Sequence, residues 1–193
     1  MYFPVVVSRV AVVLAILSTL LTALQPASAQ SPARAPVLDT ALKDTIRAMT
    51  VVNDRKMPVL EGRGLVISFF ASWCPPCRPE FAELNALRQT FSSDDLTIIA
   101  INLFESYFAD EGGARMKRFL RQTQPGFVVV QAKDDVTVTQ SFGGVDRIPT
   151  VYIYDRAGNP VYTFIHQQGA SKMHATAKEI TPFIQKALTS PTK

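Results

Sequence analysis

Continuous apolar runs alternate with stretches of helical periodicity in the middle of the chain. The apolar runs at 65–70, 96–103 and 127–131 have the length and the residue types of strands that are buried on both faces. Apolar side chains recur at helical spacing through 81–91 and 114–122, which lie between these runs. This alternation predicts a parallel α/β unit with right-handed crossovers.

The pattern changes near residue 150. Residues 150–154 and 161–165 have the composition of two further strands, and the segment 155–160 between them is rich in turn-forming residues. Two strands joined by such a loop predict a β-hairpin, which makes this sheet mixed rather than purely parallel.

A last helix is predicted after the hairpin. Ser171 can cap it, and it runs to about Leu188, with a kink or a restart at Thr181 and Pro182. The second half of the fold is therefore ββα. Together with the first βαβ half it predicts an α/β fold in which helices flank a central mixed sheet.

Residues 1–29 have the pattern of a secretory signal peptide. Arg9 precedes an apolar run over 10–24, and an Ala-Ser-Ala triplet ends at Ala29. The run is shorter than the roughly 20 residues of a membrane-spanning helix, although a retained N-terminal membrane anchor is the alternative. We expect cleavage after Ala29 and an exported, periplasmic protein.

The next segment, 30–49, is expected to be a linker or N-terminal segment ahead of a single domain over 50–193. Its first residues are rich in Pro, Ala and Ser, which is typical of a flexible tether. Helical spacing is present over 39–49. The apolar residues at that spacing are Leu42, Ile46 and Met49.

The charge of the chain is nearly balanced. The chain has 20 Lys and Arg against 16 Asp and Glu, a formal net charge of +4, and loss of residues 1–29 removes one Arg and no acid. No run of Lys or Arg is interleaved with aromatic residues, so a nucleic-acid partner is not expected. We expect a monomer.

The only two cysteines, Cys74 and Cys77, directly follow the first predicted strand and enclose two prolines. A disulfide that closes so short a loop removes little chain entropy, so a stabilising staple is disfavoured. A structural zinc needs four ligands, and the only histidines, His166 and His174, are far away in sequence. A copper-binding module that uses the two cysteines remains an alternative. A C-x-x-C pair on a βαβ pattern favours redox chemistry, with no cofactor beyond the disulfide itself.

The position of the cysteines suits that chemistry. A strand that ends just before them delivers them to the carboxyl edge of the sheet, where open α/β sheets carry their sites. Pro75 and Pro76 fit the first positions of a helix, which puts Cys74 at or near its N-cap. The helix dipole then stabilises a Cys74 thiolate, the species that attacks a disulfide. Cys77, one turn later, is expected to resolve the mixed disulfide.

Three segments together carry a resemblance to a known family: FFASWCPPCRPE, IIAINLFES and GGVDRIPTVYIYDRAGNPVY. They resemble the TlpA/ResA branch, also called DsbE-like, of the thioredoxin superfamily, over about residues 55–188. The resemblance implies a thioredoxin fold and an exported or membrane-tethered thiol–disulfide oxidoreductase. It also implies a cis peptide bond between Ile148 and Pro149.

The resemblance implies a set of site residues. The active-site motif falls on residues 73–77, with Cys74 and Cys77 as the catalytic pair. Glu105 falls where related proteins carry an acid near the resolving cysteine, and a carboxyl group there is placed to shuttle its proton. The alternative of equal weight is an ordinary exposed acid on the loop after a strand. Glu80 matches an acid on the active-site helix, although a first-turn acid that favours the helix dipole is an equally simple reading. The expected substrate-binding residues are Trp73, Pro75, Pro76, Ile148 and Pro149.

Members of this branch commonly act as reductases, so the resemblance also implies partners. These are exported proteins with cysteine pairs, in cytochrome c or copper-site assembly, and a membrane thiol-reductant transporter of the DsbD/CcdA kind. The alternative within the same enzyme class is a thiol oxidase, whose redox potential favours the opposite reaction.

Two departures from the family pattern stand out. Pro79 lies earlier in the helix than the usual proline, and Arg147 precedes Ile148 where Gly or Thr is usual.

Overall fold

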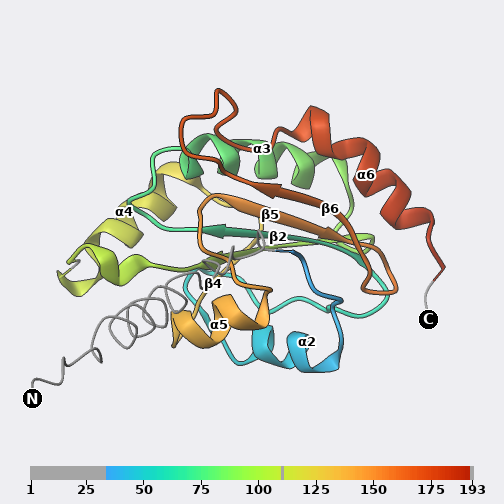
Figure 1. Cartoon of the computed structure of the whole chain (residues 1–193), viewed down its shortest axis with the longest axis horizontal. Coiled ribbons are helices and arrows are strands. Elements are labelled where there is room, and N and C mark those ends of the chain that lie inside the picture. Colours follow the sequence, from blue (N-terminus) through green and yellow to red (C-terminus); the bar gives the residue numbers. More distant parts are fainter. Residues whose placement is uncertain (1–33, 110, 192–193) are drawn as a thin grey trace, which may run out of the picture. The chain divides into compact units, whose positions relative to one another are not determined.

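The computed structural model describes residues 34–109 and 111–191, in which the strands form one six-stranded sheet (Figure 1). The strand order is β1-β4-β3-β2-β5-β6. Strands β2, β3 and β4 are parallel to one another, whereas β1, β5 and β6 pair antiparallel with their neighbours. The strands are β1 (Thr50–Val51), β2 (Gly64–Phe70), β3 (Leu96–Asn102), β4 (Val128–Gln131), β5 (Thr150–Tyr154) and β6 (Pro160–Ile165).

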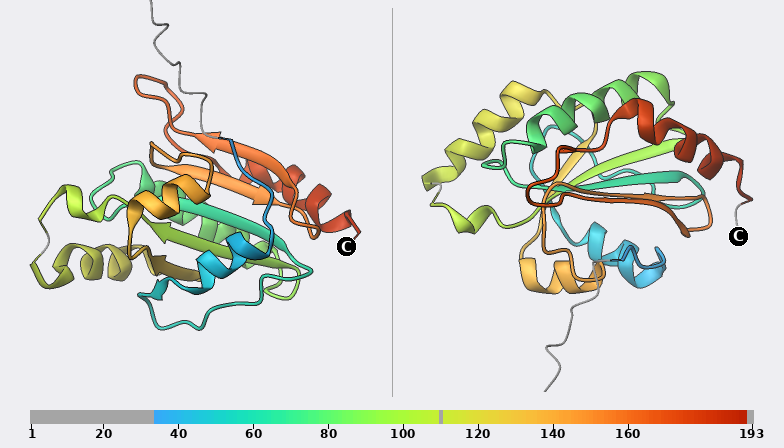
Figure 2. Two further views of the ribbon diagram at one scale, coloured as in Figure 1. Left: turned by 60° about the horizontal axis from the view of Figure 1, so that its bottom comes forward. Right: turned by 45° about the horizontal axis from the view of Figure 1, so that its top comes forward.

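Helices cover both faces of this sheet (Figures 1 and 2). Helices α3, α4 and α6 pack on one face, and α2 and α5 pack on the other. The helices are α2 (Thr40–Arg47), α3 (Cys77–Thr90), α4 (Ala114–Thr123), α5 (Asp135–Ser141) and α6 (Ala177–Thr189), with short 3₁₀ turns at Glu105–Tyr107 and Glu111–Gly113. The predicted fold, a βαβ half followed by a ββα half around a mixed sheet, is confirmed.

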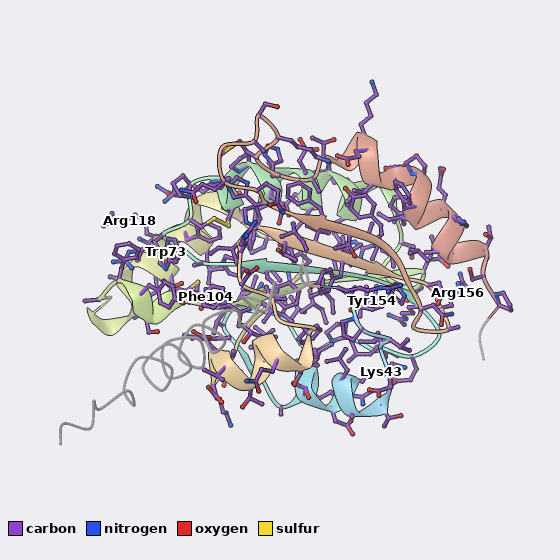
Figure 3. The ribbon with its side chains drawn as sticks, viewed as in Figure 1. Lys43, Trp73, Phe104, Arg118, Tyr154 and Arg156 are labelled. Carbon is purple, nitrogen blue, oxygen red and sulfur yellow. A yellow bond between two sulfur atoms is a disulfide. The ribbon has the colours of Figure 1, made fainter. Side chains whose placement is uncertain are left out.

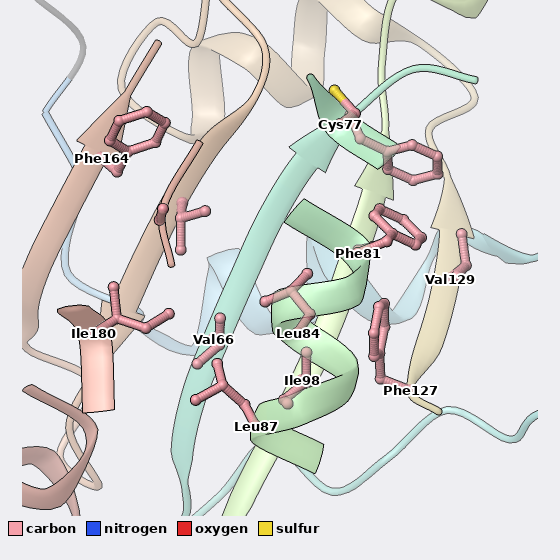
Figure 4. Packing of buried hydrophobic residues seen from close by; sticks show 14 of the residues in the cluster. Val66, Cys77, Phe81, Leu84, Leu87, Ile98, Phe127, Val129, Phe164 and Ile180 are labelled. Atoms are coloured by element: carbon pink, nitrogen blue, oxygen red, sulfur yellow. The ribbon is translucent and has the colours of Figure 1, made fainter. Parts of the chain in front are cut away.

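Side chains that alternate along the central strand form two cores. In β2, Val66 and Phe70 face the core beneath α3, whereas Leu65, Ile67 and Phe69 face the core above α2 and α5. Figure 4 shows the inner side of α3 packed on β2, β3 and β4. Burial of each such side chain stabilises the fold by roughly 1.5–3 kcal/mol. This two-sided burial is why the strands read as continuous apolar runs.

The segment before β1 belongs to this folded unit, so the expected domain start at residue 50 is too late. The predicted helix is present as α2, with Leu42 and Ile46 buried in the second core. Ahead of it, the Leu38 N–H donates to the carbonyl of Gly158 (2.8 Å). Gly158 has a positive φ of 85°, and a Cβ there would meet the Leu38 carbonyl oxygen at 2.6 Å. The close approach requires glycine at this position.

The last helix starts later than expected and is continuous. Thr176, not Ser171, is its N-cap, and its side chain accepts a hydrogen bond from the Glu179 N–H. Thr and Glu three residues apart are the signature of a capping box. Pro182 lies inside the helix and does not end it.

Helix α5 was not predicted. Its sequence is DVTVTQS, in which β-branched residues favour strands. Asp134 overrides that preference as N-cap, because its carboxylate accepts from the backbone N–H groups of Val136 and Thr137. Val138 and Phe142 then enter the second core.

The predicted signal peptide and its alternative, a membrane anchor, lie outside the described residues. Within residues 34–109 and 111–191, no helix has both the length and the apolar character needed to cross a bilayer.

Candidate functional site

The two cysteines form a disulfide at the carboxyl edge of the parallel strands. Cys74 and Cys77 are bonded, with 5.4 Å between their Cα atoms, and the bond is visible in Figure 3. Cys74 follows the end of β2 by four residues, and Cys77 is the first residue of α3. Both are buried: Cys74 retains 2% of its surface exposed and Cys77 none.

The helix after the disulfide starts later than predicted. Pro76 is its N-cap, so Cys74 lies in a turn before the helix rather than at the cap. The turn closes through the Cys77 N–H, which donates to the Cys74 carbonyl (3.3 Å). The two prolines between the cysteines have no backbone N–H, so they cannot donate the hydrogen bonds that would extend the helix towards Cys74. Pro79 lies in the first turn, where its missing N–H breaks no helical hydrogen bond.

Pro149 lies at the same sheet edge as the segment that leads to Cys74. The antiparallel register pairs Phe69 of β2 with Thr150 of β5, so the end of β2 and the start of β5 are neighbours. The Ile148–Pro149 peptide bond is cis, as predicted. Ile148 packs against both cores, and the Thr150 hydroxyl donates to the Arg147 carbonyl (2.8 Å).

Glu105 is tied to the backbone just before Trp73. Its carboxylate accepts hydrogen bonds from the Ser72 N–H (2.9 Å), from the Ser72 hydroxyl and from the Asn102 side-chain amide (2.8 Å). Both carboxylate oxygens are therefore engaged. The loop after β3 is thus joined to the loop after β2, a contact between segments about thirty residues apart.

Trp73 is the centre of a group of aromatic side chains from the same two loops. Its indole N–H donates to the Phe104 carbonyl (2.8 Å). Its ring lies nearly parallel to that of Tyr107, with 6.2 Å between ring centres, and edge-on to that of Phe108 at 5.1 Å. Phe104 in turn packs on Tyr107. Figure 3 labels Trp73 and Phe104 at the same end of the sheet as the disulfide.

Glu80, which the resemblance matches to an acid on the active-site helix, lies beside Cys77 in the structure. It follows Cys77 by three residues, so the two are neighbours on one face of α3. Glu80 is fully buried, and the Ser68 hydroxyl donates to its carboxyl oxygen (2.5 Å). Burial raises the pKa of Glu80 to about 8, although the Ser68 hydroxyl and the backbone of Ala175 favour the charged form. A first-turn acid at this spacing is visible in the sequence, but its surroundings depend on Ser68 of β2 and on the backbone of Ala175, ahead of α6.

The structure thus brings most predicted site residues to one edge of the sheet. Residues 73–77 form the loop and the first residue of α3, Ile148 and Pro149 enter β5 at that edge, and Glu105 anchors the loop through Ser72. Within the described part of the chain, no group of three or more His, Cys, Asp or Glu side chains is arranged to hold a metal ion.

Comparison with known proteins adds a family and a set of relatives. The model of the Redoxin family matches residues 37–180. The thiol-disulfide oxidoreductase ResA of Bacillus anthracis is 29% identical over 123 residues, which cover 64% of this chain and 66% of ResA. ResA of Bacillus subtilis is 27% identical and covers 64% of each chain. The matched part is thus just under two thirds of the length of these relatives.

Solved structures with a similar fold include StoA from Bacillus subtilis and a thiol-disulfide isomerase from Corynebacterium glutamicum. StoA has a TM-score of 0.53 and 20% identity, covering 70% of this chain and 92% of StoA. The isomerase has a TM-score of 0.61 and 13% identity, covering 82% of this chain and 99% of the isomerase. At these identities the likeness concerns the fold, and it agrees with the thioredoxin fold implied by the sequence.

Proposed function

This chain belongs to the Redoxin family, and from that premise we propose that it is a thiol–disulfide oxidoreductase that exchanges disulfides with cysteine pairs of other proteins. The observation that carries the proposal is the Cys74–Cys77 disulfide, which lies at the carboxyl edge of the sheet and at the start of α3. Relatives that match this part of the chain bear the name thiol-disulfide oxidoreductase.

In the reducing direction, the Cys74 thiolate attacks one sulfur of a client disulfide. The client S–S bond breaks, a Cys74–client disulfide forms, and the released client thiolate takes up a proton. Cys77 then gives up its proton, and its thiolate attacks the Cys74 sulfur. The Cys74–Cys77 disulfide closes and the second client thiolate leaves and takes up a proton. Two electrons have moved to the client, and a dithiol of another protein restores the pair by the reverse steps.

The assignment of Cys74 as the attacking residue is supported by its place in the chain. Cys74 lies in the turn outside the helix and keeps some exposure, whereas Cys77 is the fully buried first residue of α3. A partner sulfur therefore meets Cys74 first. The free N–H groups at the start of α3 favour a thiolate beside them.

We assign proton exchange with Cys77 to Glu80, its buried neighbour on α3. A carboxyl group with a pKa of about 8 is mostly neutral near pH 7 and can accept and return a proton in that range. Proton transfer by Glu105 stays a prediction. Its three hydrogen bonds to Ser72 and Asn102 support a role in holding the loop before Cys74.

The physiological setting is part of the proposal. We propose export, on the pattern of residues 1–29, and clients that are exported proteins with cysteine pairs, in cytochrome c or copper-site assembly. A membrane transporter of the DsbD/CcdA kind supplies the reducing equivalents. The reduction potential of the Cys74–Cys77 pair decides whether the protein reduces or oxidises its clients. A value near that of thioredoxin, about −270 mV, supports a reductase, and a value near that of DsbA, about −120 mV, supports an oxidase.

The experiment that tests the activity compares three proteins: the unchanged chain, Cys74→Ser and Cys77→Ser. Each is mixed after reduction with a peptide closed by one disulfide, and released peptide thiol is measured over time. We expect release of two peptide thiols per protein molecule with both cysteines present, release of one thiol with Cys77→Ser because the other stays in the mixed disulfide, and no release with Cys74→Ser. Equal slow rates for all three would contradict the proposal.

A further inference from the structure

We propose that a basic cavity at the amino edge of the parallel strands binds a phosphate-bearing anion. The cationic side chains that carry the proposal are Arg55, Lys56 and Arg88, which all line this basic cavity. The inference concerns a second binding site and goes beyond the proposed disulfide exchange.

The basic cavity lies at the opposite end of the strands from the disulfide. Its lining includes Leu96 and Val128, the first residues of β3 and β4, and Arg63, which directly precedes β2. The cysteines instead follow the carboxyl end of β2. Because β2 has seven residues, about 20 Å of strand separates the two places. A small ligand in the basic cavity therefore leaves the cysteines free.

Positive charge dominates the lining of the basic cavity. Arg63 is already paired, because its guanidinium lies 3.7 Å from the Asp94 carboxylate. Among the described residues, no ion pair involves Arg55, Lys56 or Arg88. The charged side chains of the lining are four cations and one acid: Arg55, Lys56, Arg63, Arg88 and Asp54.

The acids whose side chains are not described do not adjoin the basic cavity in the chain. Residues 1–33 contain neither Asp nor Glu. Asp110 and Glu111 precede α4, whereas the lining takes in Gly126 and Phe127, which follow it. This helix of ten residues is about 15 Å long. The chain therefore ties these two acids to the other end of α4.

Two of the unpaired cations meet at the same short segment. The Arg55 Nε–H donates to the Pro125 carbonyl (3.2 Å). The next residue, Gly126, lies against Arg88, since a Cβ there would be 3.2 Å from the Arg88 Cγ. Burial and, secondarily, the charge of Arg55 lower the pKa of Arg88, which agrees with this closeness. An anion between the two guanidinium groups would relieve their repulsion.

Arg88 is held in place before any ligand arrives. Its guanidinium donates to the carbonyls of Leu96 (2.7 Å) and Phe91, and so binds the end of α3 to the start of β3. A guanidinium has five N–H donors, so both Arg88 and Arg55 keep donors for a ligand. A group ordered in advance loses little conformational entropy on binding.

The geometry and the size of the basic cavity favour a phosphate group. One planar carboxylate pairs with one guanidinium fork, whereas a tetrahedral phosphate can accept from two guanidinium groups and an ammonium group together. The volume is about 280 Å³, just below the roughly 300–1,000 Å³ of small-molecule pockets. The ligand is thus a phosphate or diphosphate group, either free in solution or on the headgroup of a phospholipid.

The test measures binding of the full chain to two kinds of probe. Titration calorimetry with inorganic phosphate and pyrophosphate, against potassium chloride at equal ionic strength, detects a free anion. Co-sedimentation with phosphatidylglycerol vesicles detects a headgroup, and phosphatidylcholine vesicles measure any binding that needs no negative charge. The cavity variant is Arg55→Gln with Lys56→Gln. Arg88 stays unchanged because it also holds the end of α3.

The matched control is Lys133→Gln with Lys178→Gln, which removes the same charge at exposed positions outside the basic cavity. We expect the unchanged protein and the control to bind pyrophosphate or phosphatidylglycerol, and the cavity variant to bind about tenfold more weakly. Weakened pyrophosphate binding identifies a free anion as the ligand. Weakened vesicle binding without pyrophosphate binding identifies a headgroup.

Absence of binding to every probe would overturn the proposal. Equal weakening in the cavity variant and the control would also overturn it, because net charge rather than the basic cavity would then attract the anion. All three proteins should release peptide thiols at the same rate, since the cavity lies far from the cysteines. Loss of that exchange in the unchanged protein would count against the proposed function alone.

Discussion

Ser72 donates both its backbone N–H and its hydroxyl to the carboxylate of Glu105. This pair joins the loop after β2, which carries the cysteines, to the loop after β3, which carries Phe104, Tyr107 and Phe108. The reactive loop is therefore held by a side chain about thirty residues away in addition to its own backbone hydrogen bonds.

Glu105→Ala should destabilise the oxidised protein by roughly 1.5–3 kcal/mol, because hydrogen bonds to a charged acceptor are lost while the Ser72 donors stay partly buried. Glu105→Gln keeps one acceptor oxygen and should cost less. Denaturant unfolding measures both. If Glu105→Ala unfolds like the unchanged protein while peptide exchange collapses, the acid acts in chemistry and not as an anchor.

Glu80 should make the stability depend on pH. Its pKa is raised to about 8 in the fold from a usual value of 4.5, so the folded state holds the proton more tightly than the unfolded chain. The stability from neutral Glu80 is therefore full below about pH 4.5 and is lost as the pH rises through about 8.

The matched comparison is Glu80→Gln, which cannot ionise. Relative to it, the unchanged protein should lose about 1.4 kcal/mol of unfolding free energy per pH unit between about pH 5 and pH 8. Denaturant unfolding of both oxidised proteins across this range measures the difference. Parallel pH profiles would show that Glu80 is ionised in the fold.

Phe81 is the aromatic centre of the core beneath the disulfide. Its ring lies 4.7 Å from that of Phe70, 4.8 Å from that of Phe119 and 5.3 Å from that of Phe127. Phe81→Ala should cost about 3–5 kcal/mol of unfolding free energy. Phe183→Ala, at a position of α6 that is 38% exposed, should cost far less. Equal losses for the two would contradict the assigned packing.

The strands and the redox pair could be predicted because each leaves a local signal. Strands β2 and β3 are buried on both faces, so they appear as unbroken apolar runs, and two cysteines around two prolines form a motif within four residues. The cis bond before Pro149 followed from the family resemblance and not from the residues themselves.

The features that escaped prediction depend on contacts between distant segments. The buried Glu80 meets its hydrogen-bond donor, Ser68, on β2, and Trp73 meets Phe104 across two loops. Helix α5 depends on one capping side chain that outweighs the strand preference of its valines and threonines. No periodicity along the chain carries this information.

Capture of the mixed disulfide is the most direct test of Cys74 as the residue that attacks a client disulfide. Reduced Cys77→Ser protein is mixed with a disulfide-closed peptide, and the adduct is digested and mapped by mass spectrometry. We expect one peptide bound through Cys74, and no adduct with Cys74→Ser under the same conditions. An adduct that forms only through Cys77, or none at all while both thiols prove accessible, would contradict it.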